Sequence, residues 1–271
     1  MIASIIIPVF NQISFTKICM ESLQATRPED SEIIIVNNGS SDETSRYLSE
    51  CRDITVIQND RNLGCAAAWN QGIKASRGQW IAILNNDIIL SPGWLNKLLD
   101  FAIEKNADIV SPAFREGPYN YDIAAYSKEF TRKMQRASRM GVAQGICFMV
   151  KRRVFDRIGF FDENFKIGQY EDADFFRRAK QAGYVLGTTG RSVIHHFGSI
   201  TQNRILEEMP DNPYEKQNRI YYRRKHHLTS WKRFIERRTS KLRDRWWSIS
   251  EHALYGHTMV EKCIKGRLRY F

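Results

Sequence analysis

Residues 79–92 read QWIAILNNDIILSP, and this stretch indicates the class of fold. An apolar run from Trp80 to Leu84 is interrupted by two amides and a carboxylate, NND, before the apolar run resumes at Ile88. A turn in water is normally richer in Gly and Ser, although Asn and Asp also favour turns. The pattern indicates a buried strand that ends at a site where a bound group needs oxygen ligands.

Strands and helices alternate along the first 112 residues. β-branched or apolar runs indicate strands at 4–9, 32–36, 54–58, 80–84 and 107–111, and the intervening segments indicate helices at 13–25, 40–51, 63–76 and 92–105. Such alternation predicts an α/β fold with a mostly parallel sheet flanked by helices, in which ligands bind beyond the carboxyl ends of the strands. The polar residues after the second and fourth strands are therefore expected at one edge of the sheet.

The pattern becomes less regular after residue 112. Residues 113–140 are polar and basic and indicate a loop-rich or helical insertion. A strand is expected at 145–150, a helix at 172–183 and a short strand at 193–196. We expect one domain over residues 1–202, in two halves that meet at residue 112, and a basic helical extension over residues 203–271.

The composition fits a folded protein with a charged extension. Apolar residues make up 42% of the 271 residues and charged residues 26%, which argues against global disorder. Of the net charge of +11, most lies in residues 203–271, which hold 17 Lys and Arg against 8 Asp and Glu. Five scattered cysteines, no signal peptide and no membrane-spanning run predict a cytoplasmic protein, and leave open a peripheral position on the inner membrane face.

Two candidate metal ligands follow from the residue types. Asp87 with its flanking amides can hold Mg²⁺ or Mn²⁺ when a substrate diphosphate fills the other positions. His195 and His196 end a predicted strand, and either can ligate a metal, although a histidine in such a place is more often a satisfied core residue.

A second acidic cluster precedes the predicted helix at 172–183. Glu171, Asp172 and Asp174 lie within four residues, and acids at a helix start are a common structural device. Three acids exceed what capping needs, so Asp172 is a candidate general base. The helix start near Gly64 lacks both G-x-G-x-x-G and G-x-x-x-x-G-K-[ST], which argues against a dinucleotide fold and a P-loop.

Seven segments occur in an order that is more specific than any one of them. They are SIIIPVFNQ, IIIVNNGSSDETS, RNLGCAAAWNQGIKASRG, WIAILNNDIILSPGWL, GICFMVKRRVFDRIGFFDENF, YEDADFFRRAKQAGY and VIHHFGS. Together they resemble the family 2 glycosyltransferases, which have the Rossmann-like GT-A fold. The resemblance implies an inverting hexosyl- or rhamnosyltransferase of polysaccharide biosynthesis. Such an enzyme moves a sugar from a UDP- or dTDP-linked donor to a hydroxyl of a polysaccharide or a lipid-linked saccharide.

The resemblance also implies a role for each matching position. Residues 1–112 would bind the nucleotide sugar, and 113–202 would bind the acceptor and carry the catalytic residues. Asp172 would be the catalytic base and Glu171 would orient the base or the acceptor. Asp87 and His196 would hold a divalent metal, Mn²⁺ or Mg²⁺. The nucleotide-sugar site would comprise Pro8, Val9, Phe10, Asn11, Asn38, Asn62, Gly64, Asn70, Asn85, Asn86 and Asp87.

Two amides depart from the family pattern. Asn38 and Asn86 lie where the family usually has acids. These departures raise an alternative, a non-catalytic nucleotide- or glycan-binding module on a decayed transferase fold. The presence of Asp87, Asp172 and His196 argues against that alternative.

The basic extension interleaves aromatic residues with Arg and Lys. Such a segment can lie on an anionic membrane surface, contact another subunit in a homo-oligomer, or present a solvated helical face. Binding to RNA is disfavoured because no RNA-recognition motif accompanies the charge, and we expect no nucleic-acid partner.

Overall fold

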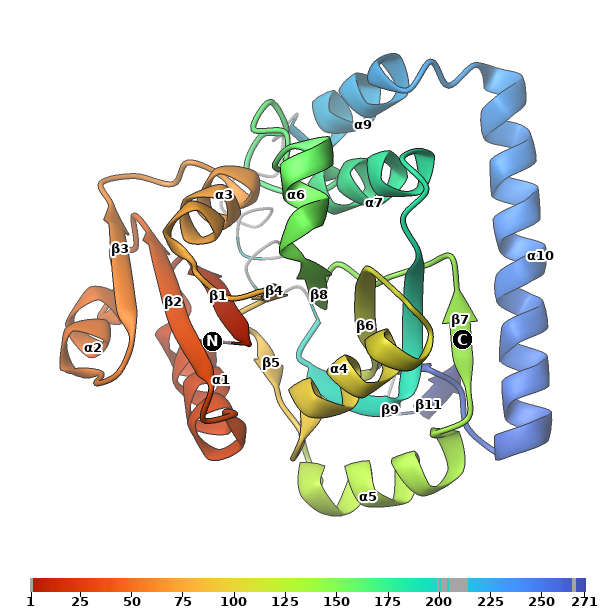
Figure 1. Cartoon of the computed structure of the whole chain (residues 1–271), viewed down its shortest axis with the longest axis horizontal. Helices are drawn as coiled ribbons and strands as arrows, with labels where there is room; N and C mark the ends of the chain where they lie inside the picture. The colour runs from red at the N-terminus through yellow and green to blue at the C-terminus, as the bar shows by residue number, and fades with distance from the viewer. Residues whose placement is uncertain (1, 199, 201–203, 205–213, 265–266) are drawn as a thin grey trace.

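One mixed sheet organises the chain (Figure 1). The computed structural model describes residues 2–198, 200, 204, 214–264 and 267–271. Within these residues the sheet has eleven strands, with the main order β11-β10-β6-β8-β4-β1-β2-β3, and β9 joins β5, β6 and β7. The strands of the first half are β1 (Ala3–Val9), β2 (Ser31–Asn38), β3 (Thr55–Asn59), β4 (Trp80–Leu84) and β5 (Ile88–Ile89).

The first four strands run parallel, as the sequence predicts. β1 pairs with β2 and β4, and β2 pairs with β3, all in parallel register. The carboxyl ends of β2 and β4 therefore lie at the same edge of the sheet, which confirms that Asn38 and the NND turn share an edge.

Helices cover both faces of this sheet, so its strands are apolar on both sides. Alternate residues of β1 enter different cores, because successive side chains of a strand point to opposite faces: Ile5 and Ile7 enter one and Ile6 the other. The first core includes residues of α1 (Ile13–Thr26), α2 (Thr44–Glu50) and α4 (Trp94–Glu104). The second includes residues of α3 (Cys65–Ala75), α6 (Arg152–Ile158) and α7 (Glu171–Gln181).

The second half of the sheet is mixed. β8 (Cys147–Lys151) lies antiparallel between β4 and β6 (Ile109–Glu116). The strand expected at 193–196 is the end of a longer one, β9 (Leu186–His196), because its first residues pair with β6 and β7 (Ser138–Met140). The insertion expected at 113–140 contains the end of β6, α5 (Ile123–Met134) and β7.

The basic extension forms two helices and then returns to the sheet. α9 (Tyr214–Lys225) is followed by α10 (Ser230–Tyr255), which stands upright at one side of the molecule in Figure 1. The last strands, β10 (Val260–Ile264) and β11 (Arg267–Tyr270), were not predicted, and β10 pairs in parallel with β6. The expected boundary between residues 202 and 203 lies outside the described residues.

A buried ion pair attaches the end of α10 to the body. Arg139 of β7 donates from Nε to Glu251 Oε1 at 2.7 Å, and both side chains are about 5% exposed. The N–H of Met259 donates to the same carboxylate at 2.9 Å. Among the helices in the described part of the chain, none is long and apolar enough to cross a membrane.

Candidate active site

Three strand ends bring Asp87, His196 and Glu116 into one row. β5 pairs antiparallel with β9 so that Ile88 lies opposite His196, and β6 pairs with β9 so that Glu116 also lies opposite His196. Nε2 of His196 lies 3.5 Å from Asp87 Oδ2, and its Nδ1 lies 3.1 Å from Glu116 Oε2. The imidazole of His196 is therefore held between two carboxylates.

The charges in this row stabilise one another. Burial alone would lower the pKa of His196, but hydrogen bonds to Asp87 and Glu116 outweigh burial and raise the pKa to about 9. The hydrogen bond with His196, together with Lys262, lowers the pKa of Glu116 to about 2. The two carboxylates therefore favour the protonated imidazole, and Nε2 of His196 would have to release its proton before it could bind a metal.

The neighbouring His195 lies in a different environment, since adjacent residues of a strand face opposite sides. Its Nδ1 lies 2.9 Å from the hydroxyl of Tyr121, and aromatic rings including Tyr119 and Phe197 surround it. Burial lowers the pKa of His195 to about 4. The structure therefore places His196, and not His195, beside Asp87.

The donor set at Asp87 fits a divalent cation with few protein ligands. Oδ1 of Asp87 is buried without a hydrogen-bond partner among the described residues, and Oδ2 accepts from the N–H of Ile200 at 3.1 Å. Within the described ranges, no group of three or more His, Cys, Asp and Glu side chains is arranged to hold a metal. The Oδ1 of Asp87, unpartnered among the residues that the structure describes, with Nε2 of His196 3.5 Å from the same carboxylate, fits a site in which substrate oxygens and water would supply the other ligands.

The acids at the start of α7 divide into two kinds. Asp174 is fully buried and lies 2.8 Å from two cationic side chains, those of Arg178 and Lys225, and 2.8 Å from the imidazole of His226. This network connects α7 to the end of α9, so Asp174 has a structural role.

Asp172 has no such partner in the described part of the chain. It is half-buried, and its Oδ1 accepts from the N–H of Ala173 at 2.7 Å. Its other oxygen lies against Gly145, where a side chain of any size would collide with it. Burial raises the pKa of Asp172, and burial together with Asp172 raises the pKa of the adjacent Glu171 to about 8. Oε2 of Glu171 has no hydrogen-bond partner among described residues.

The segment before β8 joins the two acidic centres. The N–H of Asn85 donates to the carbonyl of Ile146 at 3.0 Å, and Gly145 next to it contacts Asp172. Cys65 at the start of α3 has its pKa raised by burial and then by the charges of Glu171, Asp172 and Asp87. The NND turn and the start of α7 therefore lie at the two ends of one short segment, although 85 residues separate Asp87 from Asp172 in the sequence.

Asn38 organises the loop that leads to α3. Its Oδ1 accepts from Asn59 and from the N–H of Leu63, each at 3.0 Å, and its Nδ2 donates to Asn62 Oδ1 at 2.9 Å and to the carbonyl of Gly64. A carboxylate at this position has no N–H to donate to those two oxygens. The amide at Asn38 is therefore explained by local structure.

Two further amides of the expected donor site also have structural partners. Asn70 is buried and binds the backbone of Phe161 and the carboxylate of Glu163. Asn86 is buried and donates to Thr16 Oγ1 at 3.0 Å. These contacts bring α3 to the loop before α7 and the NND turn to α1.

The remaining expected donor residues lie around the same sheet edge. Pro8 and Val9 end β1, and Phe10 and Asn11 follow it. Asn11 has a left-handed backbone and accepts through Oδ1 from the N–H of Ser41 at 2.8 Å, so this loop is joined to the turn after β2. Gly64 also has a positive φ, of 90°, and approaches Ile167 closely.

Sequence reasoning missed two residues that shape the site. Glu116 was not predicted because the strand expected at 107–111 extends five residues further in the structure. A polar residue at the carboxyl end of a strand is the signal that would have identified it. Asn218, in α9, binds the loop at residues 166–169, and nothing in its local sequence indicates this.

The sequence matches the family model described as glycosyl transferase family 2 over residues 4–159. It is 30% identical over 211 residues to the uncharacterized glycosyltransferase YwdF of Bacillus subtilis, covering 74% of this chain and 76% of that protein. It is 29% identical over 192 residues to the glycosyltransferase AglE of Haloferax volcanii, covering 68% of this chain and 62% of that protein.

The fold is similar to that of the 1–349 fragment of S. aureus TarS, solved in complex with UDP-GlcNAc, with a TM-score of 0.59 at 16% identity. The similarity covers 73% of this chain and 58% of the TarS chain. It confirms the predicted α/β fold with a mostly parallel sheet flanked by helices.

Proposed function

Because this chain belongs to glycosyl transferase family 2, we propose that it transfers a sugar, with inversion, from a nucleoside diphosphate donor to a hydroxyl of a glycan acceptor. The observation that carries this proposal is that the segment before β8 contacts both acidic centres: the carbonyl of Ile146 accepts from the N–H of Asn85 beside Asp87, and Gly145 contacts Asp172. Asp87 lies at the carboxyl ends of parallel strands, where ligands bind in such sheets. Glu171 and Asp172 lie at the start of α7.

Asp172 is the general base of this proposal. It accepts the proton of the acceptor hydroxyl as the hydroxyl oxygen attacks the anomeric carbon of the donor and the nucleoside diphosphate departs. A single displacement needs one base, and Asp172 is the half-buried acid of the cluster. Glu171, with its raised pKa, would carry a proton at neutral pH and so avoid a second negative charge beside the base.

The donor is proposed to be a UDP- or dTDP-linked sugar bound across residues 1–112. The complex of TarS with UDP-GlcNAc supports this class of donor for a chain of the same fold. Residues 8–11 and the Asn38–Asn62 network border the carboxyl ends of β1 and β2. Asp87 and His196 would hold Mn²⁺ or Mg²⁺, which when bound would stabilise the negative charge of the leaving diphosphate.

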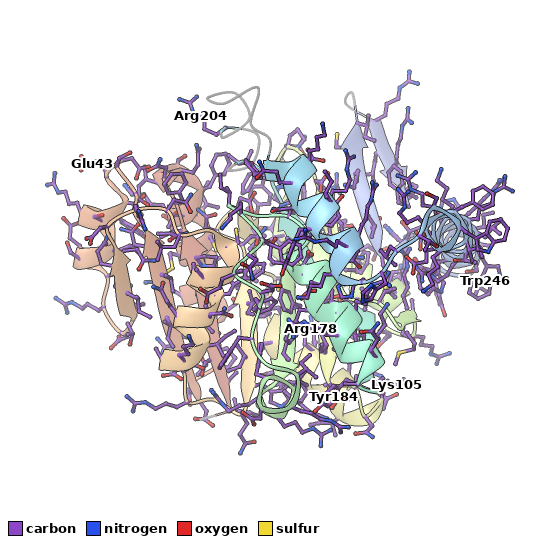
Figure 2. All side chains as sticks on the ribbon, turned by 90° about the horizontal axis from the view of Figure 1, so that it is seen from above. Glu43, Lys105, Arg178, Tyr184, Arg204 and Trp246 are labelled. Atoms are coloured by element: carbon purple, nitrogen blue, oxygen red, sulfur yellow. The ribbon has the colours of Figure 1, made fainter. Side chains whose placement is uncertain are left out.

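The acceptor is proposed to be a polysaccharide or lipid-linked saccharide, bound by residues 113–202 at an anionic membrane surface. One side of α10 carries exposed apolar residues at helical spacing, with exposed fractions from 50% to 69%: Trp231, Phe234, Leu242, Trp246 and Ile249. Trp246 lies at the outer edge of the molecule (Figure 2). Arg238 and Arg245 lie on the same exposed side, so the helix combines apolar and cationic groups as interfacial helices do.

The base assignment is tested with Asp172→Asn. We expect turnover to fall by about 10³-fold, because the amide cannot accept the proton, while the affinity for UDP or dTDP stays within about twofold. Asp156→Asn, which changes an exposed acid on α6 in the same way, is the matched control. Near-normal turnover of Asp172→Asn would remove this residue from the role.

Membrane contact is tested with the full chain and vesicles that contain phosphatidylglycerol. Trp231→Ser with Trp246→Ser should lower co-sedimentation with these vesicles at least about tenfold, because both rings lose apolar contact with the lipid. Ile103→Ser, at a 74%-exposed apolar residue of α4, should leave co-sedimentation unchanged. Equal binding of the wild type and the double variant would contradict the membrane proposal.

A further inference from the structure

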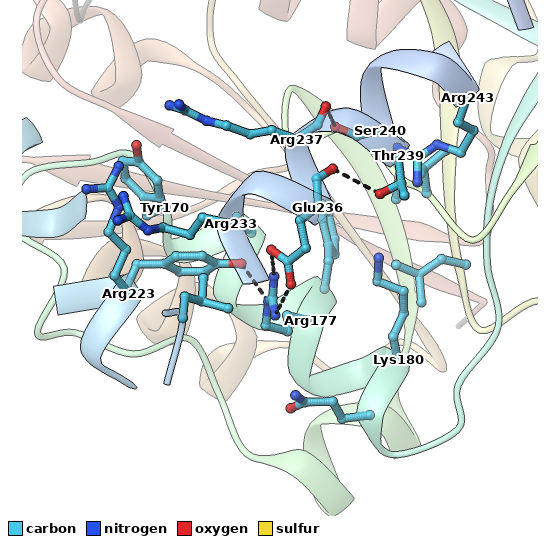
Figure 3. A pocket seen from close by; sticks show the side chains of 18 of the residues that line it. Tyr170, Arg177, Lys180, Arg223, Arg233, Glu236, Arg237, Thr239, Ser240 and Arg243 are labelled. Atoms are coloured by element: carbon cyan, nitrogen blue, oxygen red, sulfur yellow. Dashed lines mark hydrogen bonds and ion pairs between the residues drawn. The ribbon is translucent and has the colours of Figure 1, made fainter. Parts of the chain in front are cut away.

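A basic cavity lies between α7, α9 and α10. Its volume is about 740 Å³, and seven of its lining residues are Arg or Lys whereas one, Glu236, is acidic (Figure 3). All three helices contribute cations. The cavity is therefore built mainly by the C-terminal extension, against one face of α7.

Most of the positive charge in the cavity is not neutralised by the protein. Arg177 forms an ion pair with Glu236, in which its two terminal nitrogens lie 2.9 and 3.2 Å from the carboxylate oxygens. Arg177 also donates to the hydroxyl of Tyr222. In the described part of the chain, Arg219, Arg223 and Arg237 have no ion pair. The lining of the cavity therefore carries several more positive than negative charges.

The cations also act on one another. Nε of Arg219 and Nε of Arg233 are buried without hydrogen-bond partners among the residues that the structure describes. Desolvation and the neighbouring charges of Arg233 and Arg219 lower the pKa of Arg223. Desolvation and Arg243 lower the pKa of Lys180 in the same way. Like charges that repel and lack partners would be stabilised by a bound anion.

The cavity begins beside the proposed base. Tyr170, two residues before Asp172, and Ala173, directly after it, both line the cavity, and so does Phe176, one helical turn further along α7. Tyr170 lies at the same end of the cavity as Arg223 and Arg233 (Figure 3). An anion at this end would belong to the molecule whose hydroxyl reaches Asp172.

We propose that this cavity binds a phosphate or diphosphate group of the acceptor, an inference that rests on the proposed function because Asp172 fixes where the acceptor hydroxyl lies. Planar guanidinium groups suit phosphate oxygens, since each can donate two parallel hydrogen bonds. The phosphate is carried either by a lipid-linked saccharide or by a soluble phosphorylated glycan. The cavity and the exposed apolar residues of α10 lie on opposite sides of that helix, so a lipid-borne diphosphate would have to pass around α10 to enter the cavity.

The test measures binding of three probes by calorimetry: inorganic pyrophosphate, farnesyl diphosphate and glucose 1-phosphate. Arg223→Gln with Arg233→Gln should weaken binding of pyrophosphate at least tenfold and raise or preserve the melting temperature, because like-charge repulsion is relieved. Arg238→Gln with Arg245→Gln removes the same charge from the exposed side of α10 and should leave the affinity within about twofold. Equal affinity of the wild type and the cavity variant would overturn the proposal, as would no binding of any probe by the folded wild type.

A competition experiment separates this cavity from the donor site. Pyrophosphate should bind equally well to protein saturated with UDP, whereas displacement of pyrophosphate by UDP would place it in the donor site and overturn the proposal. Farnesyl diphosphate that binds tighter than pyrophosphate would identify a lipid-borne acceptor; equal affinity, or preference for glucose 1-phosphate, would identify a soluble one. Either pattern supports the cavity as an anion site only if the cavity variant loses the binding.

Failure of this inference and failure of the proposed function give different results. If Asp172→Asn loses turnover but the cavity variant keeps its affinity for all probes, the base assignment stands and the cavity proposal is wrong. If the cavity variant loses the probes but Asp172→Asn turns over normally, the cavity binds anions and the base assignment is wrong.

Discussion

Asn218 of α9 and Lys166 exchange two hydrogen bonds, although 52 residues separate them. Nδ2 of Asn218 donates to the carbonyl of Lys166 at 2.9 Å, and the N–H of Lys166 donates to Asn218 Oδ1 at 2.9 Å. The same Nδ2 lies within 3.2 Å of the carbonyls of Gly168 and Gln169. The C-terminal extension thereby binds the loop that leads directly into Glu171 and Asp172.

This loop has an unusual backbone that needs such support. Ile167, Gln169 and Tyr170 all have positive φ angles, between 59° and 77°, which cost free energy for residues other than glycine. The N–H of Cys65 also donates to the carbonyl of Ile167 at 2.7 Å. The position of Asp172 therefore depends on contacts from α3 and α9.

We predict that Asn218→Ala lowers both stability and turnover. The side chain is 1% exposed, and its loss leaves buried carbonyls unpaired. The free energy of unfolding should therefore fall by about 2–4 kcal/mol. Turnover at a temperature where the variant is folded should also fall, because the loop before Asp172 is released. Chemical denaturation and donor turnover measure the two effects, with Gln217→Ala, an exposed neighbour on α9, as the control. A variant with normal turnover would show that α9 does not position Asp172.

Gly145→Ala is predicted to affect turnover more than folding. A Cβ at Gly145 would collide with the carboxylate of Asp172, and the displacement of that side chain should reduce kcat about 100-fold, as misplacement by about 1 Å does elsewhere. Gly145 has an ordinary backbone conformation, so alanine adds no backbone strain. Steady-state kinetics and thermal melting separate the two effects, and Gln144→Ala is the neighbouring control. Unchanged kcat would show that Asp172 can move without loss.

The sequence pattern predicted those strands whose formation is determined by the residues of the strand itself. β1, β2 and β4 were recognisable because strands buried on both faces are apolar throughout. β10 and β11 were not, because their sequences are charged and β6, the strand with which β10 pairs, lies about 145 residues earlier; β11 in turn pairs with β10.

The residue types predicted candidate site residues in two places, where polar residues end an apolar strand and where acids gather at the start of α7. Asp87 follows directly from the interrupted apolar run, whereas the choice of His196 over His195 depends on the pleat of β9 and its register with β5. Glu116 and Asn218 act through partners 80 and about 50 residues away, and no local pattern records such contacts. The roles of these residues in catalysis stay predictions.

The pH dependence of stability should reveal Glu171. Burial and Asp172 raise the pKa of Glu171 from 4.5 to about 8 in the folded protein. Between these values the folded protein keeps a proton that the unfolded chain has released, so the stability from this group is complete below pH 4.5 and is lost as the pH rises through about 8. Glu171→Gln cannot titrate and should therefore become progressively more stable than the wild type from pH 5 to pH 8.

Thermal melting from pH 4 to pH 9 measures this difference. Glu29→Gln, at an exposed glutamate, should give a melting curve parallel to that of the wild type at every pH. Parallel curves for Glu171→Gln would contradict a raised pKa in the folded protein.

The metal response of nucleotide binding should depend on Asp87 and His196. Asp87→Asn and His196→Gln should each remove the strengthening of UDP binding by Mn²⁺, because they take away a proposed ligand. Glu116→Gln should weaken that response about tenfold, since Glu116 holds the other nitrogen of His196. His195→Gln should preserve it, because His195 faces Tyr121. A Mn²⁺ response that survives Asp87→Asn would place any metal elsewhere.

Asp174 should behave unlike Asp172, although only two residues separate them. Asp174→Asn leaves the cations of Arg178 and Lys225 without their shared buried carboxylate, so the variant should be destabilised by about 3 kcal/mol. Its kcat should change little at temperatures where it remains folded, because Asp174 contacts α9 and not the proposed acceptor site. Denaturation and steady-state kinetics on Asp172→Asn and Asp174→Asn form the matched pair: the first should lose turnover and keep stability, and the second should do the reverse. A loss of kcat in folded Asp174→Asn as large as that in Asp172→Asn would mean that the acids of α7 act together and that their separation into a base and a structural acid is wrong.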